Sequence, residues 1–217
     1  MAQIYIVEDH PVMRQGYAAL VEAEMGLEIC GKTGSAPEAR QEISEVEPDL
    51  AIIDLSLEEG SGLEVVKDLQ NLCPDLPILV VSVHDEELYA ERVLQAGASG
   101  YLTKNEPSEK VIKAIHRILE GGVFFGEKVR DQMLFRFHGG NSEKVQPMLE
   151  DLSDRELEVF EYMGRGLTSS EIAEELNLSP KTIDTYRGRA KEKLGLDSNA
   201  ELRRRAVMWI ELDKPEL

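Results

Sequence analysis

The chain has 217 residues, of which 42% are hydrophobic and 30% charged, a composition typical of a globular protein with one large or two ordinary domains. No apolar run approaches the roughly 20 residues of a membrane span, and the first residues lack the basic start and long apolar stretch of a signal peptide, so we expect a cytoplasmic protein. The net charge of −18 argues against non-specific binding of nucleic acid by the chain as a whole.

Over residues 1–121, short apolar runs alternate with segments of helical periodicity. Five runs are rich in Ile, Leu and Val and lack the alternation of a half-exposed strand, as in parallel strands buried on both faces. These predicted strands are 4–7, 27–30, 50–54, 78–82 and 100–103. The helices predicted between them are 11–24, 36–47, 62–72, 85–96 and 108–120. Five strand–helix pairs predict an α/β doubly wound domain with a five-stranded parallel sheet.

The composition changes after residue 121. A connecting segment is expected at 122–150, with one helix at 127–137 and a linker at 138–148 that contains two glycines and a proline. Residues 151–217 are predicted to form a second, all-α domain of four short helices. The helix starts are indicated by capping boxes that begin at Ser153, Thr168 and Ser198, and by the pair Ser179-Pro180.

Acidic, hydroxyl and basic side chains stand at the ends of the predicted strands. Glu8 and Asp9 follow the first strand, and Asp54 ends the third. Ser82 ends the fourth strand, and Lys104 follows the fifth. Because the carboxyl ends of parallel strands meet at one edge of the sheet, where such folds bind ligands, we expect these five side chains to converge.

The converging residue types suit phosphoryl transfer. Three carboxylates brought together repel one another unless a cation neutralises them, and oxygen ligands that leave room for water and phosphate suit Mg²⁺. With Mg²⁺ and Lys104 to neutralise a phosphoryl group, the Asp54 carboxylate is placed to attack it in line. Taken singly, Asp54 is explained as well by a strand-end acid, and Ser82 by a helix cap. Their joint occurrence at successive strand ends favours the site.

Residues 1–121 resemble the receiver domain of bacterial two-component response regulators, which has a flavodoxin-like fold. The similarity rests on IVEDH, IIDLSLEEGSG, VVS and GYLTK in this order, with 28 residues from Asp54 to Ser82 and 22 from there to Lys104. The resemblance implies that Asp54 accepts a phosphoryl group from a sensor histidine kinase. It also implies Glu8, Asp9, Asp54 and the backbone carbonyl of Ser56 as Mg²⁺ ligands, and Ser82, Lys104 and Tyr101 as phosphoryl-binding or switch residues.

The stretch LTSSEIAEELNLSPKTIDTYRGRAKEKLG, residues 167–195, has the pattern of two helices joined by a tight turn. The second helix carries Ile183, Ala190 and Leu194 at helical spacing on its inner face. Such a pair predicts a helix-turn-helix whose outer basic face binds DNA phosphates. The predicted DNA-binding residues are Lys181, Thr182, Asp184, Thr185, Gly188 and Arg189. Arg187 lies near the apolar stripe and is expected to be mainly structural.

An ordinary solvated helix would explain these charges alone, but residues 151–212 resemble the LuxR-type DNA-binding domain through LSDRELEVF, GLTSSEIAEELNLSPKTIDTYR and KEKLG. With the receiver in front, the chain is similar to transcriptional regulators of the NarL/FixJ type. The resemblance implies a recognition helix at 179–194, double-stranded DNA as a partner, and a homodimer that pairs through 198–210 on phosphorylation. Asp184 is unusual there, because an acid repels phosphate unless it contacts a cytosine amine.

We therefore expect a phosphorylation-dependent, DNA-binding transcriptional response regulator that is not an enzyme. Two alternatives stay open at this point. An aspartyl-phosphate hydrolase also uses a strand-end aspartate and Mg²⁺, but it needs a second acid two residues later, where this chain has Ser56. A DNA-binding regulator that acts independently of phosphorylation would keep the pocket only for folding.

Overall fold

The computed structural model describes residues 1–57, 61–84, 86–127, 129–131, 149 and 151–212. The chain divides into two compact units, Met1–Asn141 and Ser142–Leu217. Within the described helices, none is long and apolar enough to cross a membrane.

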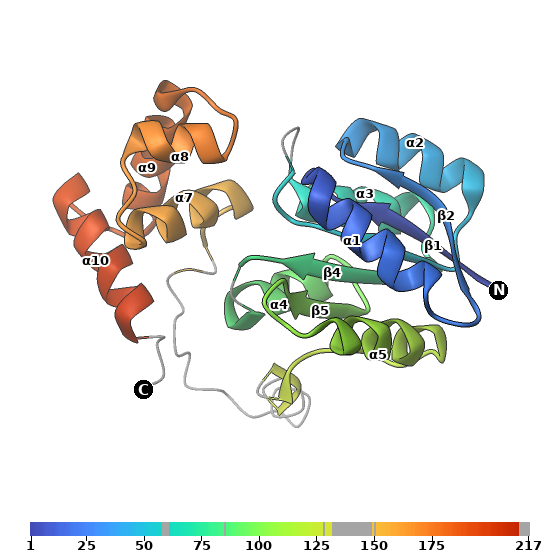
Figure 1. The fold of residues 1–217 in the computed structure, drawn as a ribbon. Coiled ribbons are helices and arrows are strands. Elements are labelled where there is room, and N and C mark those ends of the chain that lie inside the picture. Colours follow the sequence, from blue (N-terminus) through green and yellow to red (C-terminus); the bar gives the residue numbers. More distant parts are fainter. Residues whose placement is uncertain (58–60, 85, 128, 132–148, 150, 213–217) are drawn as a thin grey trace. The chain divides into compact units, whose positions relative to one another are not determined.

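The first unit is a parallel sheet between two layers of helices (Figure 1). Its strands are β1 (Ala2–Val7), β2 (Leu27–Thr33), β3 (Leu50–Ile53), β4 (Ile78–Ser82) and β5 (Gly100–Thr103), and they pair in the order β2-β1-β3-β4-β5. The helices are α1 (Pro11–Glu22), α2 (Ala36–Val46), α3 (Gly62–Leu72), α4 (Glu86–Gln95) and α5 (Ser108–Leu119). All four strand pairs are parallel, which confirms the predicted doubly wound α/β fold.

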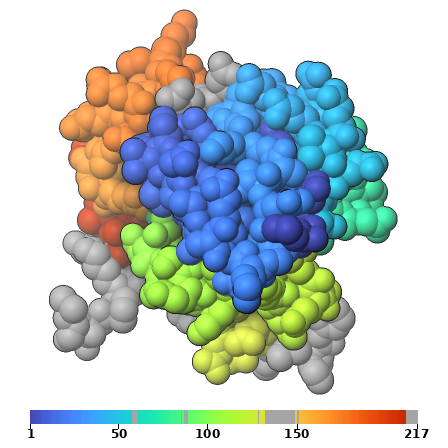
Figure 2. All heavy atoms as spheres, turned by 45° about the vertical axis from the view of Figure 1, so that its right-hand side comes forward, coloured from blue at the N-terminus to red at the C-terminus, as the bar shows by residue number. Residues whose placement is uncertain are grey.

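The sheet is buried on both faces, because α1 and α5 cover one side and α2, α3 and α4 cover the other (Figure 1). Ile4 and Ile6 of β1 pack into the core beneath α1 and α5, whereas the alternate residues Tyr5 and Val7 are fully buried on the opposite face. In the space-filling view, α1 (blue) and α5 (green) lie side by side over this core (Figure 2). This double burial explains why the strands are continuous apolar runs in the sequence.

Strand β2 continues three residues beyond its predicted end, to Thr33. The extension crosses Gly31, where an added Cβ would lie 2.3 Å from Cε2 of Tyr5. Glycine is therefore required here by the close approach of the Tyr5 ring, whose hydroxyl donates to Glu42. Because glycine weakens a strand, the sequence pattern predicts that β2 ends before Gly31. In the structure, the pairing of β2 with β1 continues past this residue.

The chain after α5 returns to the sheet edge beside β5. Phe124 forms a parallel bridge with Gly100, its N–H donates to the Ser99 carbonyl, and its own carbonyl accepts from the Tyr101 N–H at 2.8 Å. Residues 127 and 129–131 are helical, as predicted. The remainder of the helix predicted at 127–137 and the linker predicted at 138–148 lie outside the described residues.

The second unit contains the four predicted helices α7 (Asp154–Gly164), α8 (Ser169–Glu175), α9 (Pro180–Lys193) and α10 (Asn199–Leu212). The capping boxes at Ser153 and Thr168 are complete, with side-chain and backbone bonds in both directions. The third is partial, because the Glu201 carboxylate accepts from the N–H of Asp197 instead of Ser198. The interior includes the Phe160 and Trp209 rings, whose centroids lie 5.9 Å apart.

Candidate functional site

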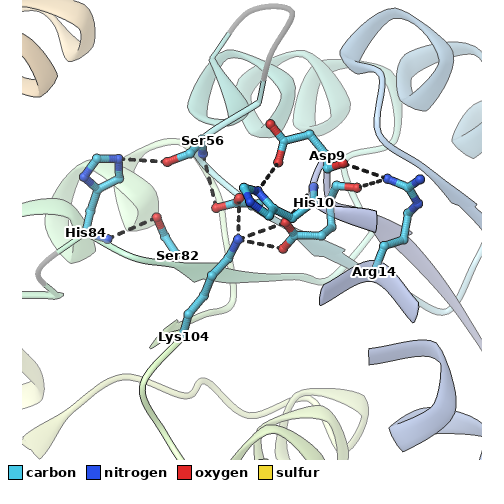
Figure 3. A network of polar contacts seen from close by, with 9 residues as sticks. Asp9, His10, Arg14, Ser56, Ser82, His84 and Lys104 are labelled. Atoms are coloured by element: carbon cyan, nitrogen blue, oxygen red, sulfur yellow. Dashed lines mark hydrogen bonds and ion pairs between the residues drawn. The ribbon is translucent and has the colours of Figure 1, made fainter. Parts of the chain in front are cut away.

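The carboxyl ends of the strands bring the predicted pocket residues together (Figure 3). Strands β1 and β3 are neighbours, and the Asp54 N–H donates to the Val7 carbonyl at 2.9 Å, so the acids that follow these two strands are held side by side. The Lys104 N–H donates to the Ser82 carbonyl at 2.7 Å, which fixes the lysine at the adjacent edge. Backbone pairing of the sheet therefore places the site.

Lys104 joins two buried acids. Its Nζ lies 2.7 Å from Asp54 Oδ2 and between 2.7 and 2.9 Å from the two Glu8 carboxylate oxygens. Both acids are 1% exposed, and Asp54 Oδ1 accepts in addition from the Ser56 N–H at 3.2 Å. Asp9 adds a third carboxylate at the same edge of the sheet (Figure 3). These three carboxylates therefore carry more negative charge than Lys104 neutralises.

The pKa values of Asp54, Glu8 and Lys104 are shifted in the directions that burial and this excess of negative charge produce. Burial raises the pKa of Asp54, and the Asp9 charge raises it slightly further, although Lys104 and the Ser56 N–H act in the opposite direction. The pKa of Glu8 is also raised, first by burial and then by the Asp54 charge. Burial alone would lower the pKa of Lys104, but the two carboxylates outweigh it and leave that pKa above its ordinary value. An additional cation would favour both ionised acids.

The oxygens present fit a hard divalent cation. Within the part of the chain that the structure describes, no hydrogen-bond donor reaches the buried Asp9 Oδ1, and His10 Nδ1 lies 3.6 Å from it. Glu8, Asp9 and His10 offer ligand atoms that all lie within 4.8 Å of one another, although the His10 side chain is 76% exposed. A buried, unsatisfied carboxylate oxygen beside two further acids is the donor set that Mg²⁺ prefers.

Ser82 and Tyr101 both bond to the backbone of His84, a residue that is not among the predicted site residues. The Ser82 hydroxyl accepts from the His84 N–H at 3.3 Å, and the Tyr101 hydroxyl donates to the His84 carbonyl at 2.9 Å. The ring stacks on Tyr89, and its Nε2 lies 3.1 Å from the Ser56 hydroxyl. His84 follows the end of β4 by two residues, as Ser56 follows Asp54, and this shared spacing was the available signal.

In the second unit, α9 presents the predicted outer face. Ile183, Ala190 and Leu194 are buried, as their spacing predicted. On the other side, Lys181, Asp184, Thr185 and Arg189 are exposed, while Thr182 and Gly188 are half-buried. The Thr182 hydroxyl bonds with the hydroxyl of Ser179, the residue that caps α9, and the Thr185 hydroxyl donates to the Lys181 carbonyl within the helix. The two basic side chains are therefore the strongest candidates for phosphate contacts on this face.

The negative charge of Asp184 is offset inside the unit. Arg187 Nη1 lies 3.2 Å from Asp184 Oδ1 and also donates to the Ser169 hydroxyl, while that hydroxyl donates to the same aspartate oxygen at 3.1 Å. These bonds join α8 to α9. Arg187 has the structural contacts expected from the sequence, and Asp184 is turned toward α8 by them.

Two family models match the chain. Residues 4–116 match the response regulator receiver domain, and residues 150–206 match the bacterial regulatory proteins of the luxR family. Over 204 residues, the chain is 32% identical to the oxygen regulatory protein NreC of Staphylococcus carnosus (strain TM300), with 92% of this chain and 94% of that protein covered. The NreC protein of Staphylococcus aureus (strain JH9) is 31% identical over the same coverage.

Solved structures agree with this architecture. A two-component response regulator of the LuxR family from Aurantimonas sp. SI85-9A1 is 29% identical, with a TM-score of 0.58 over 64% of this chain and 99% of that one. RcsB from Salmonella enterica serovar Typhimurium, bound to the promoter rprA in the presence of phosphomimetic BeF3⁻, is 23% identical, with a TM-score of 0.62 over 94% of this chain and 96% of that one. The second likeness supports the fold.

Proposed function

The chain belongs to the two-component response regulators of the NarL/FixJ type, phosphorylation-dependent DNA-binding proteins, and we propose that Asp54 is the residue whose phosphorylation controls this one. One observation carries the assignment: the Asp54 carboxylate is buried at the end of β3, 2.7 Å from Lys104 and beside two further acids. The experiment that tests it is phosphorylation of the Asp54→Asn protein, described in the Discussion.

In the proposed reaction, an Asp54 carboxylate oxygen attacks the phosphorus of a phosphohistidine in a sensor kinase. A P–O bond forms as the P–N bond breaks, and the imidazole leaves with the electron pair of that bond. Lys104 Nζ already lies at Asp54 Oδ2, where it neutralises the oxygens of the arriving group. Glu8, Asp9, Asp54 and the Ser56 carbonyl would hold Mg²⁺, which supplies further charge neutralisation when bound.

The proposed switch starts from Ser82. Its hydroxyl accepts from the His84 N–H before phosphorylation and must turn to donate to a phosphoryl oxygen afterwards. That change removes a bond from His84, whose carbonyl holds the Tyr101 hydroxyl. The Tyr101 backbone in turn bonds to Phe124, in the segment that leads out of the receiver. Ser82 and Tyr101 are therefore proposed as the pair that reports phosphorylation to the connecting segment.

The proposed partners and boundaries follow from this function. A sensor histidine kinase supplies the phosphoryl group, and the receiver at 1–121 is joined through 122–150 to the DNA-binding domain at 151–217. The protein is proposed to act in the cytoplasm as a regulator and not as an enzyme. Ser56, at the position where a hydrolase needs its second acid, bonds instead with His84.

Phosphorylation is expected to favour a homodimer that binds two half-sites about one helical turn, roughly 34 Å, apart. The four-helix unit is small and its acidic residues outnumber its basic ones, so one copy alone should bind DNA weakly. Light scattering of the full chain, with and without beryllofluoride and Mg²⁺, measures the change in mass. Selection of bound DNA from a random pool then gives the half-site spacing. A monomer that selects single half-sites in the presence of beryllofluoride would contradict the expectation.

Replacing Lys181 or Arg189 with alanine is expected to weaken DNA binding and to reduce the slope of log K against log salt by about one ion per lost phosphate contact. Both side chains are exposed on α9. Arg187→Ala should instead lower the free energy of unfolding, because Arg187 joins α9 to Ser169 of α8. Filter binding at several salt concentrations and urea titration separate the two effects. An unchanged salt slope in both alanine variants would mean that another surface contacts DNA.

A further inference from the structure

Arg14 holds the backbone of the acid pair. It lies one turn into α1, and its Nη1 donates to the Glu8 carbonyl at 2.5 Å and to the Asp9 carbonyl at 3.1 Å (Figure 3). The Arg14 N–H donates to the His10 carbonyl at 2.9 Å, so the side chain starts from an ordered helical turn. One guanidinium group thus satisfies two successive carbonyls whose residues carry two of the pocket's three carboxylates.

The turn between β2 and α2 packs against the Arg14 guanidinium and the Asp9 backbone. A Cβ added at Gly34 would lie 2.8 Å from Arg14 Nη1 and 3.2 Å from Asp9 Cα. The Glu8 N–H also donates to the Thr33 carbonyl at 3.0 Å. The backbone of Glu8 and Asp9 is therefore enclosed between β2, the glycine and the guanidinium, and a methyl group at Gly34 would require the guanidinium to move.

We propose that Arg14 is a positioning residue for the divalent cation, an inference that rests on the proposed function. By fixing the two carbonyls, it fixes the backbone from which the Glu8 and Asp9 side chains project. Among the residues that the structure describes, no donor reaches the buried Asp9 Oδ1, which leaves this oxygen available as a ligand. Arg14 does not touch the cation, and its positive charge by itself opposes cation binding. The geometry of its two bonds outweighs that repulsion.

Two substitutions separate the effect of the Arg14 hydrogen-bond geometry from the effect of its positive charge. Arg14→Lys keeps the charge but replaces the planar fork with a single flexible ammonium group. Arg14→Gln removes the charge as well. The binding of Mn²⁺ to the full chain, measured by electron paramagnetic resonance and competed with Mg²⁺, reports on the site without any phosphoryl transfer. Arg14→Lys is expected to weaken binding roughly 10-fold, as is usual when residues that orient metal ligands are replaced.

The matched control is Arg40→Lys, since Arg40 makes an ion pair with Asp68 at 2.7 Å between α2 and α3. It should bind Mn²⁺ as the wild type does. Gly34→Ala provides a second test if Arg14→Lys fails to fold, because its Cβ displaces the guanidinium and should also weaken binding. Circular dichroism checks the fold of each variant.

Three results of the Mn²⁺ binding measurements distinguish a positioning role of Arg14, an effect of its charge alone, and the lack of a metal site. Weaker binding in Arg14→Lys, with Arg40→Lys unchanged, supports the positioning role. Wild-type affinity in Arg14→Lys, together with tighter binding in Arg14→Gln, would show that only charge matters and would overturn it. If the wild type itself binds no Mn²⁺ that Mg²⁺ displaces, the metal site of the proposed function fails, and the role of Arg14 fails with it.

Discussion

Asp54→Asn is expected to abolish labelling by acetyl phosphate in the presence of Mg²⁺, whereas the wild type gains one phosphoryl group by intact mass. The amide oxygen has the shape of the carboxylate but lacks its charge and nucleophilicity. Glu8 is held by Lys104, and Asp9 is expected to bind the cation, so neither acid should replace Asp54 as the acceptor. Asp68→Asn, on α3 and paired with Arg40, is the matched control and should be labelled normally. Undiminished labelling of Asp54→Asn would contradict the assignment.

The same substitution has a stability effect that excludes unfolding as the reason for lost labelling. The pKa of Asp54 is raised above its ordinary value of 3.8 in the folded protein, so the folded state binds the proton more tightly than the unfolded state. The ionised acid therefore reduces stability as pH rises from about 4 through the folded pKa. In EDTA, Asp54→Asn should have a higher free energy of unfolding than the wild type at pH 7. The difference should shrink as pH falls through the folded pKa of Asp54 and should be largely gone at about pH 4.

Lys104→Met is expected to slow labelling by acetyl phosphate roughly 100-fold, because it removes the cation that neutralises the transferring oxygens. It should also reduce the free energy of unfolding by about 3 kcal/mol at pH 7 in EDTA, since it leaves two buried carboxylates without their partner. Both acids have raised pKa values and bind protons at low pH, so the loss should diminish toward pH 4. Mg²⁺ should restore part of it by replacing the missing positive charge.

Stopped-flow labelling and urea titration in EDTA measure the two effects. Lys110→Met is the control, because Lys110 makes an ion pair with Glu106 on a surface where its side chain is 41% exposed. Such exposed pairs contribute at most about 1 kcal/mol. If the Lys104 variant matched this control in both stability and labelling rate, Lys104 would be a surface cation and not part of the site.

The fold was predictable because its main signals are local and periodic. Runs such as IYIV and ILVVS are apolar throughout, since helices cover both faces of the sheet. The convergence of Asp54 and Lys104 followed from one general property, namely that parallel strands end at the same edge. Neither inference required knowledge of how any side chain is oriented.

The contacts that refine the site depend on orientation and were not predictable. Arg14 reaches two carbonyls only because α1 begins two residues after Asp9 and Gly34 leaves space, and no residue pattern encodes that combination. The sequence did not explain why an acid stands at position 184. The structure explains it, because Arg187 and Ser169, the latter on α8, offset the charge of Asp184. Such contacts across turns depend on loop geometry and on side-chain rotamers. The hydrophobic periodicity of the sequence carries no information about either.

The central claim is that the state of Asp54 controls the affinity for DNA. Fluorescence anisotropy of a selected DNA site, titrated with the wild type and with Asp54→Asn, with and without beryllofluoride at fixed Mg²⁺ and salt, tests it most directly. Beryllofluoride is expected to tighten binding by the wild type roughly 10-fold, within the usual range of coupling between two sites, and to leave the variant unchanged. Equal affinity of the wild type in both conditions would contradict the account and identify a regulator that acts independently of phosphorylation.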